Sequence, residues 1–189
     1  MKKGNITTTL LLLIIALFVS FYYFNKAPLE NNEISLDCVT KIEQRTVNGY
    51  SLSGLIEDGE EVLIYHNYYA CNEVSKGDLV IYYYAGSSNP LIKIVKGVPN
   101  DTFDISGTEN SWNILVNNEI VTNSEGIPYL INNQRKTMLS LYIDNYNKVI
   151  PPNTYLLLGN QKHGSTDSTR FGLIDISTIM GKGEMIKNV

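Results

Sequence analysis

Apolar and polar positions divide the chain into an apolar amino-terminal segment and a series of shorter apolar runs. Residues 4–25 carry no charged side chain. A helix of these 22 residues would be about 33 Å long, against roughly 30 Å for the hydrocarbon core of a bilayer. The pattern therefore predicts one transmembrane helix near the amino terminus.

The residues that flank this segment predict its orientation. Lys2 and Lys3 precede it, whereas the residues that follow mix basic with acidic side chains. By the positive-inside rule, the amino terminus lies in the cytoplasm and the remainder lies outside the cell membrane. A cleaved signal peptide is the alternative, but bulky side chains at 21–25 occupy the place where cleavage needs small ones. We expect residues 1–28 to be a membrane anchor and residues 29–189 to be an extracytoplasmic domain.

Beyond the anchor, apolar segments of strand length recur between turn signals. Thirteen tyrosines, together with many Ile, Val and Thr, favour strands because branched and aromatic side chains pack well on a pleated surface. The predicted strands cover residues 61–69, 78–84, 91–98, 102–105, 114–116, 138–143 and 155–158. Their spacing is typical of barrel-like sheets, so we expect a mainly β domain. Residues 106–150 are richer in Asn, Ser and Lys and predict an insert or small lobe outside the core sheet.

Composition narrows the classes of function. The formal net charge is -4 and no long run of Lys or Arg is present, which argues against nucleic acid as a partner. No residues have metal-ligand spacing, and we expect neither a metal nor another cofactor. Cys38 and Cys71 both fall in the part predicted to face an oxidising compartment, so a disulfide and two buried thiols stay open. Neither His66 nor His163 has the partner spacing of a Ser-His-Asp triad.

The candidate chemistry is a serine paired with a lysine. A serine hydroxyl needs a base to become a nucleophile, and a neutral lysine can supply it. Ser51 lies in a turn-forming stretch that contains glycine, and Lys93 lies between Ile92 and Ile94. Apolar neighbours exclude water, which disfavours the ammonium form and lowers the pKa of a lysine.

Three sequence boxes resemble those of type I signal peptidases. Residues 51–54, Ser-Leu-Ser-Gly, are similar to the nucleophile box Ser-Met-x-Pro of that family. Residues 92–101, Ile-Lys-Ile-Val-Lys-Gly-Val-Pro-Asn-Asp, are similar to its lysine box Ile-Lys-Arg-Val-x-Gly-x-Pro-Gly-Asp. Residues 159–172 are similar to its third box, Gly-Asp-Asn-x-x-x-Ser-x-Asp-Ser-Arg. The boxes follow one another in the order of the family, behind a predicted anchor, so the resemblance covers nearly the whole chain.

The resemblance implies a membrane-anchored serine endopeptidase that removes signal peptides from secretory preproteins. On the matching positions it implies Ser51 as the nucleophile and Lys93 as the general base. It further implies that Ser165 hydrogen-bonds and orients the lysine amine, with Asp167 in a supporting ion pair. The backbone N–H of Ser51 would stabilise the oxyanion. The implied partners are preproteins with small side chains near the cleaved bond, and the lipid bilayer.

Several positions depart from the family pattern. Leu52 replaces Met, and Gly54 replaces Pro, which loosens the turn after the nucleophile. Gly49 has no hydroxyl where some family members offer a serine to the oxyanion. Asn160 replaces Asp, and Arg170 lies one place later than the arginine of the family, which leaves the partner of Asp167 open.

Two other functions stay open at this point. One is a maturation peptidase dedicated to a conjugation or pilin system, which the replacements at 52 and 54 allow. The other is a catalytically inactive, membrane-anchored binding module that kept the fold and lost turnover. The presence of both Ser51 and Lys93 counts against the second, and cleavage of a generic preprotein separates signal-peptide removal from the first.

Overall fold

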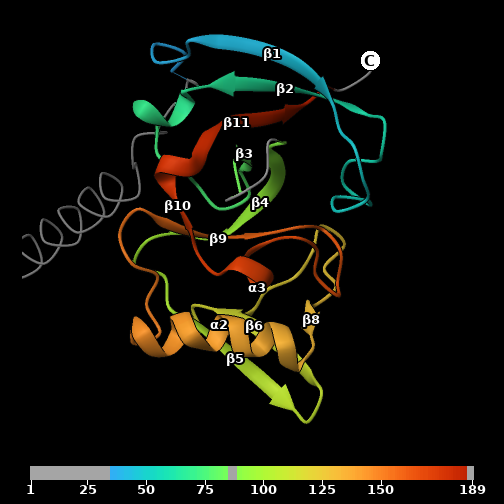
Figure 1. The fold of residues 1–189 in the computed structure, drawn as a ribbon, viewed down its shortest axis with the longest axis vertical. Helices are drawn as coiled ribbons and strands as arrows, with labels where there is room; N and C mark the ends of the chain where they lie inside the picture. The colour runs from blue at the N-terminus through green and yellow to red at the C-terminus, as the bar shows by residue number, and fades with distance from the viewer. Residues whose placement is uncertain (1–34, 85–88, 187–189) are drawn as a thin grey trace, which may run out of the picture. The chain divides into compact units, whose positions relative to one another are not determined.

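Within residues 35–84 and 89–186, which the computed structural model describes, eleven strands form two antiparallel sheets (Figure 1). The mainly β fold predicted from the sequence is confirmed. The anchor predicted at residues 1–28 lies outside the described residues. Among the residues that the structure describes, no helix is long and apolar enough to cross a membrane.

The larger sheet has seven strands in the order β1-β2-β11-β3-β4-β9-β10. Its strands are β1 (Lys41–Thr46), β2 (Glu61–His66), β3 (Leu79–Tyr82), β4 (Leu91–Gly97), β9 (Thr154–Leu158), β10 (Ile174–Asp175) and β11 (Ile179–Met185). Strands β1 and β10 are the two edges of this sheet and do not pair with each other. In the described residues the sheet is therefore open, whereas the spacing predicted a barrel-like arrangement. Short helices η1 (Tyr68–Ala70), α3 (Ser168–Phe171) and η2 (Ile176–Thr178) lie between strands that follow one another in the sequence.

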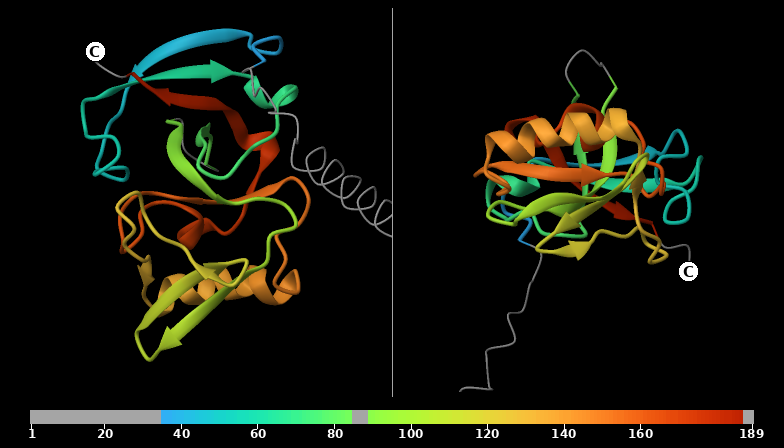
Figure 2. Two further views of the ribbon diagram at one scale, coloured as in Figure 1. Left: turned by 180° about the vertical axis from the view of Figure 1, so that it is seen from behind. Right: turned by 90° about the horizontal axis from the view of Figure 1, so that it is seen from below.

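The second sheet begins at Phe103 and continues into residues 106–150, the stretch predicted to be an insert or small lobe. It contains β5 (Phe103–Thr108), β6 (Ser111–Val116), β7 (Glu119–Ile120) and β8 (Leu130–Ile131), and α2 (Asn133–Asn145) follows. Strand β6 pairs with the other three strands. Helix α2 covers one face of this sheet, as the two opposite views show (Figures 1 and 2).

The strand predicted at 138–143 is wrong, because these residues lie in α2. The Asn132 side chain accepts a hydrogen bond from the Arg135 N–H at 3.1 Å and so caps the helix. Buried Leu139 and Ile143 are four residues apart, which places them on one face of a helix. A short apolar run is compatible with either type of element, and here the cap and this spacing favour the helix.

Apolar clusters lie on both faces of the large sheet. One contains Leu52, Ile56, Val62, Ile64, Ile81 and Ile94. Another contains Val80, Tyr82, Val95, Tyr155 and Leu157. Strand β4 contributes to both, and burying one such aliphatic side chain stabilises the fold by roughly 1.5–3 kcal/mol. Because β4 is buried on both sides, the lysine at its centre has an apolar environment.

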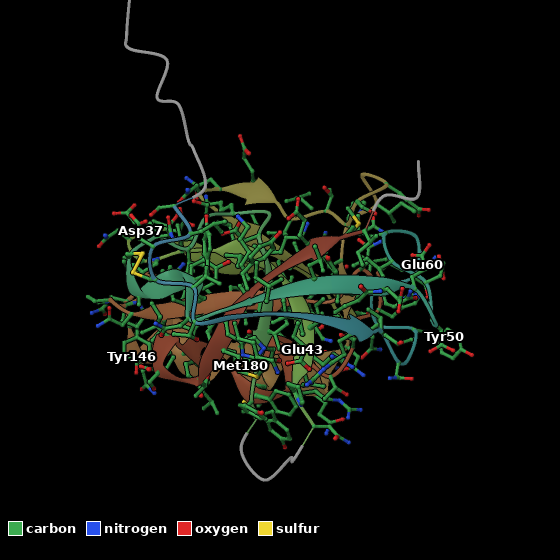
Figure 3. The ribbon with its side chains drawn as sticks, turned by 90° about the horizontal axis from the view of Figure 1, so that it is seen from above. Asp37, Glu43, Tyr50, Glu60, Tyr146 and Met180 are labelled. Carbon is green, nitrogen blue, oxygen red and sulfur yellow. A yellow bond between two sulfur atoms is a disulfide. The ribbon has the colours of Figure 1, made fainter. Side chains whose placement is uncertain are left out.

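The two cysteines form a disulfide. Cys38 precedes β1 and Cys71 follows η1, with 5.9 Å between their Cα atoms. The bond is visible beside Asp37 in Figure 3. It answers the question that the sequence left open, and it closes a long loop, which limits the freedom of the unfolded chain.

Candidate active site

The structure brings the predicted serine and lysine together. Lys93 Nζ donates a hydrogen bond to Ser51 Oγ at 2.9 Å and a second one to the carbonyl oxygen of Ile92 at 2.7 Å. Lys93 lies in the middle of β4, whereas Ser51 lies in the turn between β1 and β2. The contact therefore joins a central strand to a loop that is distant in sequence.

Burial makes this lysine a usable base. Lys93 is only 2% exposed. Desolvation lowers its pKa from 10.5 to about 8, and the negative charge of Asp167 acts in the opposite direction. At pH 7 a pKa of about 8 leaves roughly a tenth of the amine neutral, against fewer than about one in a thousand for an ordinary lysine. The site thus supplies a proton acceptor next to the hydroxyl.

The turn after Ser51 has a geometry that proline cannot adopt. Gly54 has φ +86°, in the left-handed region, whereas proline is restricted to about −65°. The Gly54 N–H also donates to Glu57 Oε1 at 2.7 Å, and proline has no N–H. The N–H of Ile56 donates to the Leu52 carbonyl at 2.9 Å and closes the turn. The replacement of Pro by Gly54 therefore gives a different turn, rather than only a looser one.

Asn160 joins this turn to the third box. It is 1% exposed, and its backbone N–H donates to the Ser51 carbonyl at 2.6 Å. Its Nδ2 donates to the Ser53 carbonyl at 3.0 Å, while its Oδ1 accepts from the Ser124 N–H at 2.9 Å. An ionised aspartate can only accept hydrogen bonds, so the Asn found here suits a position that needs a donor and an acceptor.

Asp167 is fully buried and organises the third box. Its Oδ2 accepts from the N–H of Gly159 at 3.1 Å and from the N–H and hydroxyl of Ser165 at 3.0 and 2.7 Å. Its Oδ1 accepts from the N–H and hydroxyl of Thr169 at 3.0 and 2.6 Å, which caps α3. Such a set of donors compensates the buried charge.

Ser165 makes a different contact from the one that the resemblance implies. Its hydroxyl donates to Asp167, and in the described part of the chain the Lys93 amine bonds Ser51 and Ile92 instead. Ser165 nevertheless lines the same cavity as Ser51 and Lys93. The structure therefore places Ser165 beside the pair without a hydrogen bond to the amine.

The arginine beside Asp167 is Arg135, which the sequence analysis did not identify. Its Nη1 lies 3.7 Å from Asp167 Oδ1, donates to the Ser165 carbonyl at 2.7 Å and contacts the Thr169 hydroxyl. Arg135 belongs to α2, in the second sheet's part of the chain, and no local pattern connects it with the third box. Arg170, which the sequence suggested for this role, is exposed instead.

Two cavities adjoin the serine and lysine. The first, of about 470 Å³, has an apolar side made of Val47, Val62, Ile64, Ile81 and Ile92. The second, of about 450 Å³, has several polar residues in its wall, namely Tyr50, Arg135, Gln161, Ser165, Thr166 and Arg170. Tyr50 projects at the periphery of the molecule (Figure 3). Both cavities reach Ser51 and Lys93, so a chain that occupies both would cross the reacting atoms.

His66 belongs to a group of charged side chains around Glu43. His66 Nε2 lies 2.9 Å from Glu43 Oε2, in a group of charges that also includes Lys41 and Arg45. Glu43 is labelled in Figure 3, on β1. Within residues 35–84 and 89–186, no group of three or more His, Cys, Asp or Glu side chains could hold a metal ion.

A serine hydroxyl bonded to a buried lysine beside a cleft is the arrangement of a Ser-Lys serine peptidase. Residues 5–187 match the family described as signal peptidase, peptidase S26. Signal peptidase IB of Staphylococcus aureus (strain Mu50) is 30% identical over 150 residues, which are 72% of this chain and 73% of that protein. Signal peptidase I of Bacillus licheniformis is 25% identical over 148 residues, which are 76% of this chain and 75% of that protein.

Among solved structures, a signal peptidase I from Enterococcus faecalis V583 matches with a TM-score of 0.39 and 15% identity, over 59% of this chain and 97% of that one. On the family match and the sequence relatives, the chain belongs to the signal peptidase family, peptidase S26. It is a serine endopeptidase that removes signal peptides. The resemblance drawn from the three boxes is confirmed.

Proposed function

We propose that this endopeptidase cleaves signal peptides by acyl transfer, with Ser51 as the nucleophile and Lys93 as the general base. The observation that carries the proposal is the 2.9 Å hydrogen bond between Lys93 Nζ and Ser51 Oγ, formed by an amine that is 2% exposed. Proximity removes the need for a bimolecular encounter, and burial provides the neutral amine.

The reaction proceeds in two halves. Neutral Lys93 accepts the hydroxyl proton as Ser51 Oγ attacks the carbonyl carbon of the cleaved bond. The tetrahedral intermediate collapses, the C–N bond breaks, and the ammonium group returns the proton to the departing amine. Water then attacks the acyl ester with Lys93 again as the base, which releases the signal peptide and restores the serine.

The Ser51 N–H is proposed to stabilise the oxyanion. Among the described residues it has no acceptor, so it is available to a developing negative charge. The Gly49 N–H is already engaged, since it donates to Asp58 Oδ1 at 2.6 Å. Gly49 therefore holds the loop, and the donor at Ser51 remains free for the substrate.

Ser165 and Asp167 are proposed as supporting residues. The Asp167 carboxylate accepts both the N–H and the hydroxyl of Ser165, which keeps this serine at the wall of the second cavity. Arg135 donates to the Ser165 carbonyl from the other side. Ser165 and Arg135 form part of the cavity wall, Asp167 holds them from behind, and the proposed role of all three is to position rather than to react.

The first cavity is proposed to bind the residues that precede the cleaved bond. Its aliphatic lining and its volume of about 470 Å³ suit small apolar side chains of an extended peptide. An Ala-x-Ala sequence, which ends a typical secretory signal peptide, has this character. Secretory preproteins are thus the proposed substrates.

Membrane attachment is proposed for the part of the chain before the described residues. The uncharged stretch at 4–25 is long enough to span a bilayer, and the two lysines before it favour a cytoplasmic amino terminus. Residues 29–189, with the small lobe at 106–150, then lie outside the membrane. Enzyme and preprotein would meet in one bilayer.

The test uses the full chain in detergent and a preprotein that ends its signal peptide with Ala-x-Ala. Ser51→Ala and Lys93→Ala should each abolish cleavage. Ser53→Ala, in the same turn, and Lys96→Ala, in the same strand, are the matched controls and should retain it. Equal cleavage by Lys93→Ala and the parent enzyme would exclude the lysine as the base. A protein that binds the preprotein without cleaving it would be a binding module instead.

A further inference from the structure

The second cavity contains a cation, Arg170, whose charge no carboxylate among the described residues offsets. Its lining includes Lys93, Arg135 and Arg170 and, among the described residues, neither Asp nor Glu. The whole chain has a formal net charge of -4, so a cavity wall with basic and no acidic side chains differs in sign from the protein as a whole. A local excess of one sign next to reacting atoms attracts a ligand of the opposite sign.

Arg170 is the least engaged of these cations. It lies in the last turn of α3 and is exposed, and its guanidinium has neither an ion pair nor a hydrogen bond with any residue in 35–84 or 89–186. Arg135, by contrast, directs Nη1 to Asp167 and to the Ser165 carbonyl. Burial lowers the pKa of Arg135, the negative charge of Asp167 raises it, and the nearby positive charge of Arg170 lowers it again.

We propose that the second cavity binds an acidic side chain of the substrate just after the cleaved bond, with Arg170 as the specificity-determining residue. This inference rests on the proposed function, in which small apolar residues before the bond occupy the first cavity. The first residues of the released protein then extend from Ser51 into the second cavity. A carboxylate there forms a charge-assisted, bidentate hydrogen bond with a planar guanidinium.

The preference for an acidic side chain should apply only to the substrate residues after the cleaved bond. Arg45 lines the first cavity, but Glu43 Oε1 accepts from its Nε and Nη2 at 3.1 and 2.6 Å. Its charge is therefore offset within the protein, whereas that of Arg170 is not. An anionic lipid headgroup is a weaker candidate, because a lipid in a cavity that contains Ser51 and Lys93 would obstruct the substrate.

The experiment compares three preproteins that differ only at the first two positions after the cleaved bond, which are Glu, Gln or Lys. For the full-length enzyme in neutral detergent, the kcat/KM of the Glu substrate should be roughly two to five times that of the Gln substrate, as an exposed ion pair allows. The kcat/KM of the Lys substrate should be lower than that of the Gln substrate. The difference should shrink at high salt. Arg170→Gln should lose the preference and cleave the Glu and Gln substrates with similar kcat/KM, and Arg170→Glu should favour the Lys substrate.

Arg45→Gln is the matched control and should keep the preference for Glu. Efficient cleavage of all three substrates at equal rates would overturn this inference and leave the proposed function intact. An Arg170→Gln enzyme that still prefers Glu would also overturn it. If phosphatidylglycerol micelles accelerate all three substrates equally, and only when Arg170 is present, the cavity binds lipid and the inference is wrong. No cleavage of any substrate would remove the proposed function and the inference together.

Discussion

Replacing Lys93 with Met should abolish cleavage and at the same time stabilise the fold. The lysine is 2% exposed, in the middle of a strand with apolar clusters on both faces of its sheet. Methionine is a flexible, uncharged side chain that fills irregular space in a core. The substitution therefore removes the base together with the cost of keeping an amine in an apolar environment.

The magnitude follows from the pKa. Folding lowers the pKa of Lys93 from 10.5 to about 8, which corresponds to roughly 3 kcal/mol of unfolding free energy. Because the folded pKa is the lower one, the unfolded chain binds more protons between about pH 8 and pH 10.5. The full penalty therefore applies below about pH 8, and it declines as the pH rises through this window. At pH 10 less than about 1 kcal/mol should remain.

Urea denaturation of the two proteins at pH 7 and pH 10 tests this reasoning. The advantage of Lys93→Met over the parent should be about 2 kcal/mol larger at pH 7 than at pH 10. Comparing the two pH values cancels any difference in packing or lost hydrogen bonds. Ser51→Ala retains the lysine and should show the same pH dependence as the parent. An advantage that is equal at both pH values would refute the argument that desolvation controls this amine.

Three further outcomes are expected. The kcat/KM for a preprotein should rise with pH through about 8 as Lys93 loses its proton, and a flat profile from pH 6 to 9 would contradict this. Gly54→Pro, which restores the family residue, should lower the melting temperature and activity more than Gly54→Ala. The reason is that proline can neither adopt φ +86° nor supply the N–H to Glu57. Equal melting temperatures of the two variants would contradict this. Tyr82→Phe removes a buried hydroxyl without a partner among the described residues and should leave stability unchanged or raise it by up to about 1 kcal/mol. Tyr129→Phe loses the bond to the Gly159 carbonyl and should cost about 1–2 kcal/mol, and equal denaturation midpoints for these two variants would contradict the comparison.

The contact between Ser51 and Lys93 was predictable because each residue lies in a short local pattern. Lys93 is surrounded by aliphatic residues of a buried strand, and Ser51 opens a turn that contains glycine. Central strands such as β3, β4 and β9 were predictable for the same reason, since they are continuous apolar runs. Where local composition determines burial, the sequence predicts both the strand and the apolar environment of a residue within it.

Other features depend on contacts between distant segments. Strand β1 is a polar edge strand, and β11 contains glycines, so neither has the apolar pattern of a strand. A Cβ at Gly181 would lie 2.1 Å from the Tyr65 carbonyl oxygen, which explains a glycine where propensity argues against one. Arg135 reaches Asp167 only because α2 packs on α3. No spacing in the sequence encodes that approach.

Arg135, on the helix that follows the smaller sheet, contacts the loop of Ser165 and Asp167 next to Lys93. The large sheet therefore depends on α2 for part of this loop's support. An engineer who trimmed the protein to its seven-stranded sheet would remove Arg135 along with the lobe and leave the Asp167 carboxylate without its cation. A shortened version would hold this carboxylate by the hydrogen bonds from Gly159, Ser165 and Thr169 alone.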